Sequence, residues 1–245
     1  MNNIHIPPVV KNLLIINGLF FVATYVFGSK GIDLGFYLGA FYFDSPLFRI
    51  WQPITYMFMH GGFTHILFNM FALYSFGSVL EAHWGAKRFI NFYLITGLGA
   101  LGFQWAVQAF EVYQMTGSPV NPGAITIDMF KGMASLNLHG LTQHQGETLL
   151  GIYSGPMVGA SGAIFGLLVA FGMLYPNAEL YIMFIPVPVK AKYIIPVYIL
   201  IELSLGVASF QGDSVAHYAH LGGALLGFIL VKLWKDKNTF YDYYD

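Results

Sequence analysis

Cysteine is absent from the 245-residue sequence. The chain therefore has no disulfide, catalytic thiolate, iron–sulfur cluster or cysteine-ligated zinc. Charged residues are also scarce, at 9% of the chain, against about 25% in an ordinary soluble domain. The formal net charge of −1 argues against nucleic acid as a partner. No HExxH pattern occurs, which argues against a zinc protease.

Long runs of apolar residues are abundant in the sequence. Hydrophobic residues make up 56% of the chain and the mean hydropathy is +0.61, which indicates an integral membrane protein. We expect an all-α membrane protein with six transmembrane helices. The expected spans are about Val10 to Phe27, Thr64 to Glu81, Phe89 to Ala109, Pro156 to Pro176, Tyr193 to Phe210 and Val215 to Trp234.

These spans are expected to form one membrane domain over residues 1–245. It contains an interfacial first loop at 28–50 and a long outer loop at 111–155. The first loop is rich in aromatic residues, which concentrate at membrane interfaces. The outer loop leaves room for a surface helix, but the sequence identifies no chemistry in it.

Lysine and arginine set the expected orientation of the chain. If the N-terminus is inside, eight of the eleven basic residues lie in inner segments and three in outer loops. Positive residues gather on the inner side of membrane proteins, so both termini are expected to be cytoplasmic. The second, fourth and sixth spans then run from the outside to the inside.

Three polar residues fall at one expected depth. Ser161, Asn69 and His220 each follow the expected outer start of their span by five or six residues, which is about 8 Å of helical rise. A polar group in hydrocarbon is costly unless it faces other polar groups or a wet cavity. Shared depth is the condition that contact between these residues requires.

The three residue types suggest nucleophilic catalysis. A serine hydroxyl needs a general base, which neutral histidine commonly provides. No Asp or Glu falls at the same level, so the pattern favours a Ser161–His220 dyad over a triad. The Asn69 amide could donate to an oxyanion, and His65 lies one helical turn before it on the same face. Two GxxxG patterns, at 162–166 and 223–227, permit close helix approach.

Three stretches together resemble the rhomboid family of intramembrane serine proteases, of the bacterial type. They are the HxxxxHxxxN spacing of residues 60–69, the GxSG motif of residues 159–162 and the AHxxG motif of residues 219–223. Residues 51–55, and Glu81 with Gly85, resemble further family motifs. The soluble-hydrolase elbow GxSxG does not fit, because Ala163 occupies the place of its last glycine.

The resemblance implies Ser161 as the nucleophile and His220 as the base, with Asn69 and His65 supporting the oxyanion and Gly159 shaping the site. The glycines two and three residues after His220 favour it over His217.

The resemblance also implies the setting of the activity. The expected substrates are transmembrane helices of other proteins, cut near their outer ends in the lipid bilayer, with no cofactor. The expected location is a bacterial inner or plasma membrane. Two residues depart from the family pattern. Gln52 stands where an Arg is usual, and Phe165 stands where a Tyr often stacks on the catalytic histidine.

Two alternatives remain open. His60, His65, His217 and His220 lie near the outer ends of two spans and could ligate haem or a metal. A catalytically inactive relative that only binds membrane proteins is the other. Glu202 lies within the fifth span, about 12 Å from its outer end by helical rise. We interpret it as a protonated, hydrogen-bonded structural residue, slightly too deep to act with the dyad.

Overall fold

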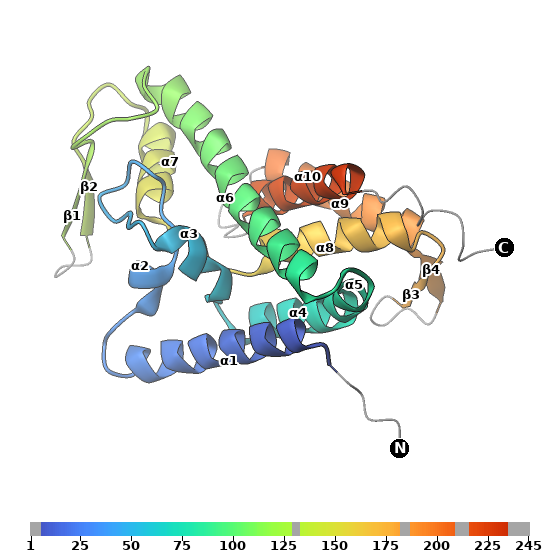
Figure 1. Cartoon of the computed structure of the whole chain (residues 1–245). Coiled ribbons are helices and arrows are strands. Elements are labelled where there is room, and N and C mark those ends of the chain that lie inside the picture. The colour runs from blue at the N-terminus through green and yellow to red at the C-terminus, as the bar shows by residue number, and fades with distance from the viewer. Residues whose placement is uncertain (1–5, 129–132, 182–186, 209–215, 235–245) are drawn as a thin grey trace.

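A computed structural model of the chain describes residues 6–128, 133–181, 187–208 and 216–234. The described chain is mostly helical, as predicted (Figure 1). Three helical stretches are long and apolar enough to cross a membrane: α1 (Pro8–Gly28), the stretch Phe63–Trp84, and α6 (Ala86–Thr116). Two shorter apolar helices are α8 (Ser161–Leu174) and α10 (His217–Leu233), and α9 (Ala191–Ala208) lies between them in the chain. The count of six crossings and the side of the termini stay predictions.

Large apolar side chains are exposed on the outer surfaces of these helices. They include Leu19, Phe63, Phe71, Tyr193, Leu200 and Val207, each at least 60% exposed. A soluble protein rarely exposes apolar surface on this scale. This surface therefore suits contact with lipid, in agreement with an integral membrane protein.

The second predicted span is one continuous but irregular helix. It consists of α4 (Phe63–Ala72), a π-helical turn η2 (Leu73–Gly77) and α5 (Ser78–Trp84). Gly85, at φ +78°, makes the turn into α6. The Glu81 carboxylate accepts hydrogen bonds from the backbone N–H groups of Val9 and Val10 at 2.9 and 2.8 Å. These N–H groups lie in the first turn of α1, where no helical carbonyl can accept from them, so Glu81 ties α1 to α5.

The first loop is built on hydrogen bonds to Gln52. The loop contains α2 (Leu34–Leu38) and leads into α3 (Gln52–Thr55) and η1 (Tyr56–Phe58). Gln52 is fully buried; its Oε1 accepts from the Arg49 N–H at 3.0 Å and its Nε2 donates to the Leu47 carbonyl at 3.0 Å. The amide thus joins the loop to α3 where an Arg was expected from the family pattern.

The long outer loop is more ordered than its sequence predicts. Helix α6 continues to Thr116, where Gly117 in the left-handed conformation ends it. An antiparallel hairpin follows, β1 (Ile125–Asp128) with β2 (Met133–Leu136), and then α7 (Gln143–Ser154), which a Thr142–Gln145 capping box begins. The β1–β2 hairpin and α7, which follow the predicted outer end of α6, are called the outer layer. A second apolar cluster joins the outer layer to the first loop; it contains Tyr42, Val112, Ala124, Ile125, Leu149, Ile152 and Tyr153.

A second hairpin lies at the other end of the helices. It pairs β3 (Glu179–Tyr181) with β4 (Pro188–Lys190), between α8 and α9. In Figure 1 the β1–β2 hairpin and α7 lie at one end of the molecule and β3–β4 lies at the other. Helices α6, α8 and α10 pack together between these ends and supply much of the main apolar core.

Candidate active site

Ser161 lies at the first residue of α8. The preceding residues 155–160 are not helical: Met157 exchanges two backbone hydrogen bonds with Ala40, and the Gly159 N–H donates to the Tyr56 carbonyl at 2.9 Å. The helix therefore starts later than the predicted start at Pro156. Extended residues rise about twice as far as helical ones, so the depth predicted for Ser161 from helical rise does not apply.

Gly159 leaves room for the neighbouring histidine. Its φ of +133° is a conformation that favours glycine. A Cβ at this position would lie 2.9 Å from both Cε1 and Nε2 of His65, and 3.4 Å from Ser161 Oγ. Any side chain would therefore displace the His65 ring, so the glycine sets the distance between His65 and Ser161.

Ser161 on α8 and His220 on α10 face each other at the contact between the two helices. His220 Nε2 lies 2.8 Å from Ser161 Oγ, at hydrogen-bond distance. The Phe165 ring stacks on the His220 ring, with centroids 4.4 Å apart and planes inclined by 7°. The stacking expected of a tyrosine at this position is thus made by phenylalanine, and it restricts the imidazole to one orientation.

Glycines bring α8 and α10 close enough for this contact. A Cβ on Gly223 would lie 1.9 Å from the Gly162 carbonyl oxygen, and one on Gly227 would lie 2.7 Å from the Gly166 oxygen. No side chain fits in such spaces, because real Cβ contacts lie beyond 3.0 Å. The two predicted GxxxG patterns therefore face each other along one helix contact.

Asn69 and His65 occupy the α4 side of the site. Asn69 is buried, and its Nδ2 donor has no hydrogen-bond partner among the described residues. A buried donor without a partner is costly, and such groups occur where a ligand or reacting group completes the bond. His65 Nδ1 accepts a long hydrogen bond, 3.4 Å, from the Gly61 N–H, and its ring lies 5.0 Å from that of His60.

Glu202 is the residue that the sequence interpretation misplaced. It is 5% exposed on α9, and its Oε2 lies 2.9 Å from His220 Nδ1 and 2.6 Å from His217 Nδ1. The expectation that no carboxylate reaches the level of the dyad was therefore wrong. Helical rise along a straight, perpendicular helix ignores helix tilt and the length of a glutamate side chain. The available signal was an intramembrane carboxylate together with two histidines one turn apart on the next helix.

Among the described residues, Glu202, His217 and His220 lie close enough together to hold a metal ion. One ligand atom from each of Glu202, His217 and His220 lies within 4.8 Å of the others. The separations from Glu202 Oε2 to the two Nδ1 atoms are those of direct hydrogen bonds. The histidine set predicted for haem or metal, which combined this pair with His60 and His65, is not the group that the structure assembles.

All five residues predicted for the site line one cavity. It has a volume of about 1700 Å³ and lies between α4, α8, α9 and α10. The predicted residues on its wall are His65, Asn69, Gly159, Ser161 and His220, and Glu202 and His217 line it as well. The predicted nucleophile, the predicted base and the Asn69 donor thus line one cavity, which is large enough for a peptide segment.

Comparison with known proteins finds similarity to rhomboid proteins, the family that the sequence motifs resemble. The chain is 26% identical over 212 residues to an uncharacterized mitochondrial rhomboid protein of Schizosaccharomyces pombe, covering 78% of this chain and 53% of the relative. It is 29% identical to RHOMBOID-like protein 12, mitochondrial, of Arabidopsis thaliana, covering 90% and 56%, and 28% identical to Rhomboid protein 1, mitochondrial, of Saccharomyces cerevisiae, covering 69% and 38%. The chain spans about half the length of the curated relatives it matches.

These relatives come from yeasts and a plant, so they give no support to the predicted bacterial membrane. The model of the Rhomboid domain family matches residues 47–235, which is most of the chain and includes every predicted site residue. The chain therefore belongs to the rhomboid family.

Proposed function

We propose that this protein is an intramembrane serine endopeptidase that cleaves transmembrane segments of membrane-protein substrates near the outer face. The 2.8 Å contact between Ser161 Oγ and His220 Nε2 carries the proposal. The two atoms lie in the wall of the cavity, between helices whose exposed apolar surfaces suit contact with lipid, in a chain of the rhomboid family. A serine that only served packing would not need a fixed, stacked histidine as its partner.

The proposed chemistry follows from the positions of these atoms. Ser161 Oγ attacks the carbonyl carbon of the peptide bond while its proton passes to His220 Nε2. The carbonyl oxygen becomes an oxyanion, which Asn69 Nδ2, His65 and the Ser161 N–H stabilise. His220 then gives the proton to the leaving amine, which releases an acyl-enzyme at Ser161. Water deprotonated by the same histidine releases the second product and restores the serine.

The proposed setting is a single rhomboid-like membrane domain of six transmembrane helices. The short length of α8 supports a site below the membrane surface: its 14 residues span about 21 Å, against about 30 Å of hydrocarbon. The substrate class is proposed on the same grounds, because a cavity between membrane helices is reached most directly by another helix in the bilayer. No cofactor takes part in the proposed steps.

The test is labelling combined with cleavage. Purified protein is treated with a serine-directed phosphonate or isocoumarin and, separately, incubated with a model transmembrane substrate. Label is expected on Ser161, and both label and cleavage should vanish in Ser161→Ala and His220→Ala. Ser29→Ala serves as the matched control, because this exposed hydroxyl at the end of α1 contacts only its own helix.

The alternative functions give different results in the same test. An inactive membrane-protein binder would hold the substrate without cutting it. A haem or metal protein would bind its group stoichiometrically and leave Ser161 unreactive. Either outcome in folded wild-type protein would exclude the protease.

A further inference from the structure

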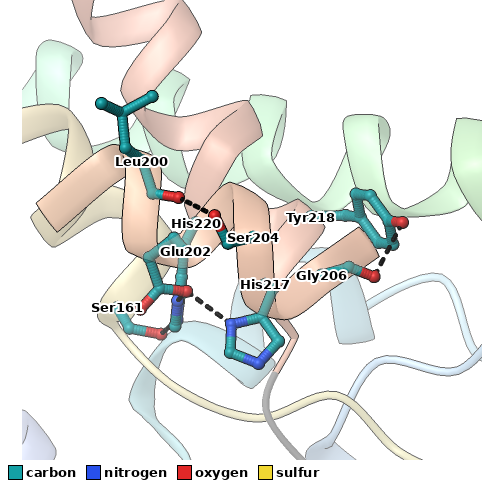
Figure 2. Close-up of polar contacts among 8 residues, drawn as sticks. All are labelled: Ser161, Leu200, Glu202, Ser204, Gly206, His217, Tyr218 and His220. Carbon is teal, nitrogen blue, oxygen red and sulfur yellow. Dashed lines mark hydrogen bonds and ion pairs between the residues drawn. The ribbon is translucent and has the colours of Figure 1, made fainter. Parts of the chain in front are cut away.

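A carboxylate lies behind the histidine of the site. Figure 2 shows Glu202 between His217 and His220, with Ser161 on the far side of the His220 ring. Oxygen Oε2 of Glu202 lies 2.9 Å from His220 Nδ1, while His220 Nε2 lies 2.8 Å from Ser161 Oγ. Serine, histidine and carboxylate therefore form one continuous hydrogen-bonded chain from three separate helices.

The position of Glu202 is fixed by contacts between α9 and α10. The Tyr218 hydroxyl donates to the Gly206 carbonyl at 3.0 Å, one helical turn beyond Glu202. A Cβ on Gly206 would lie 3.2 Å from His217 Cβ, so the glycine lets the two helices approach. His217 Nδ1 contacts the same carboxylate oxygen at 2.6 Å. The carboxylate thus has two imidazole partners and is held in one place.

These contacts select one tautomer of His220. A carboxylate oxygen accepts hydrogen bonds, so the nitrogen facing it, Nδ1, carries the proton. In a neutral imidazole the other nitrogen, Nε2, is then unprotonated and accepts from the Ser161 hydroxyl. This is the tautomer that a general base toward Ser161 requires.

We propose that Glu202 is a positioning residue: it holds His220 in the Nδ1-protonated tautomer and stabilises the imidazolium that forms when Nε2 takes the Ser161 proton. The inference rests on the proposed function and deepens it. In the attack step the Oγ–carbon bond forms, the proton moves from Oγ to Nε2, and the electron pair of the carbonyl goes to its oxygen. Glu202 remains ionised throughout, and His217 is the second donor that keeps its carboxylate in place.

The first test is substitution of the carboxylate. Glu202→Gln keeps the size of the side chain but removes its charge. Turnover should fall on the order of 100-fold, a typical share for acid–base catalysis, with KM little changed. Glu179→Gln is the matched control, because it makes the same change at an exposed residue of β3, and it should behave as wild type.

The pH profile separates positioning from a merely structural role. Three titratable groups face His220: Glu202 on α9, His217 on α10 and His65 on α4. A fourth, Tyr198 on α9, lies beside Glu202. Removing the anion leaves the imidazolium with less stabilisation. The acid limb of turnover should therefore move to lower pH in Glu202→Gln, and it should not move in Glu179→Gln.

A measurement on the wild-type chain covers the case in which Glu202→Gln does not fold. Nitrogen-15 NMR of histidine-labelled protein should find His220 protonated at Nδ1, with a strongly downfield N–H proton that is lost in His220→Ala. A wild-type His220 protonated at Nε2 instead would overturn the proposal. One zinc ion per chain in the purified protein, lost in Glu202→Gln, would also overturn it, because a metal would replace the Nδ1 protons.

The outcomes distinguish this inference from the function on which it rests. If wild type cleaves in a Ser161-dependent way and folded Glu202→Gln has the same turnover and acid limb, only the role of Glu202 is wrong. If wild type neither cleaves nor labels, the protease itself is wrong and the positioning role falls with it.

Discussion

At the scale of single residues, Asn69 combines burial with an unused donor. Its Nδ2 has no partner among the described residues, although it lines the same cavity as Ser161. Asn69→Ala should leave the protein folded, since that donor has no bond to lose. Turnover should fall by about 100-fold or somewhat less, the lower end for loss of one oxyanion donor, because His65 and the Ser161 N–H remain. Wild-type turnover in the folded variant would remove Asn69 from the mechanism.

Gln52 carries a stability prediction. Gln52→Ala would leave the Leu47 carbonyl and the Arg49 N–H without their buried partner and would open a cavity beside α3. The expected cost is about 2–4 kcal/mol of unfolding free energy, measured by thermal or denaturant unfolding in detergent. Ile54→Ala, at an exposed position of α3, is the control and should cost far less. Equal losses from both variants would mean that the amide does not anchor the loop.

The identity of most residues in the candidate site could be predicted from the sequence. Their contacts with one another could be predicted only in part. The motif spacings identified Ser161, His220, Asn69 and His65, because each chemistry needs a specific side chain at a specific helical position. Glu202 was assigned the wrong environment, because its partners come from the next helix. Contacts between helices depend on tilt, helix start and side-chain reach, and none of these follows from counting residues along one span.

At the scale of elements, the contact between α8 and α10 carries the geometry of the site. Gly223→Ala would place a methyl group 1.9 Å from the Gly162 oxygen, so the helices must move apart. We expect a loss of about 1–3 kcal/mol of stability from overpacking, and turnover at least about tenfold lower, because the Ser161–His220 contact spans this interface.

Gly102→Ala on α6 is the matched control, since nothing lies within 4 Å of a Cβ built there. Both variants are compared by thermal unfolding and by substrate cleavage. If Gly223→Ala proves as stable and active as Gly102→Ala, the close approach of the two helices is not needed for activity.

Tyr42, in the cluster that joins the first loop to the outer layer, leads to a prediction at alkaline pH. Burial raises the pKa of Tyr42 to about 12, and the nearby Asp44 charge adds to the shift; the ordinary value is about 10. Because the folded pKa is above the unfolded one, this tyrosine's contribution to stability is complete below pH 10 and is lost as pH rises through about 12. The melting temperature should fall over that window, and less steeply in Tyr42→Phe. Identical slopes would show that Tyr42 does not titrate with unfolding.

The outer layer also shows where sequence prediction stopped. The β1–β2 hairpin and α7 lie in a stretch without long apolar runs, so the hydropathy that located the membrane helices carried no information there. The Thr142–Gln145 capping box was a local signal for the start of α7. This layer packs on the first loop through Tyr42 with Pro119 and Asp44 with Tyr153, which are 77 and 109 residues apart, and such contacts could not be inferred from local pattern.

At the scale of the whole molecule, helix α6 runs from the α5 end of the structure to the end that carries the β1–β2 hairpin and α7. Its 31 residues span about 46 Å, more than the roughly 30 Å of a hydrocarbon core. Lys87 lies at its start and the hairpin and α7 lie beyond its end (Figure 1). In the predicted topology the basic residues are concentrated on the side of Lys87, so we predict that this end of α6 is inside and that the hairpin and α7 are outside.

The absence of cysteine makes this orientation directly measurable. Lys87→Cys and His144→Cys each introduce a single thiol at an exposed position on opposite sides of the predicted membrane. In intact cells, a membrane-impermeant maleimide should label His144→Cys, while Lys87→Cys should be labelled only after permeabilisation. The cysteine-free parent gives the background. The reverse pattern would invert the topology and would move the Ser161 end of α8 to the inner face, so that cleavage near the outer face could not occur.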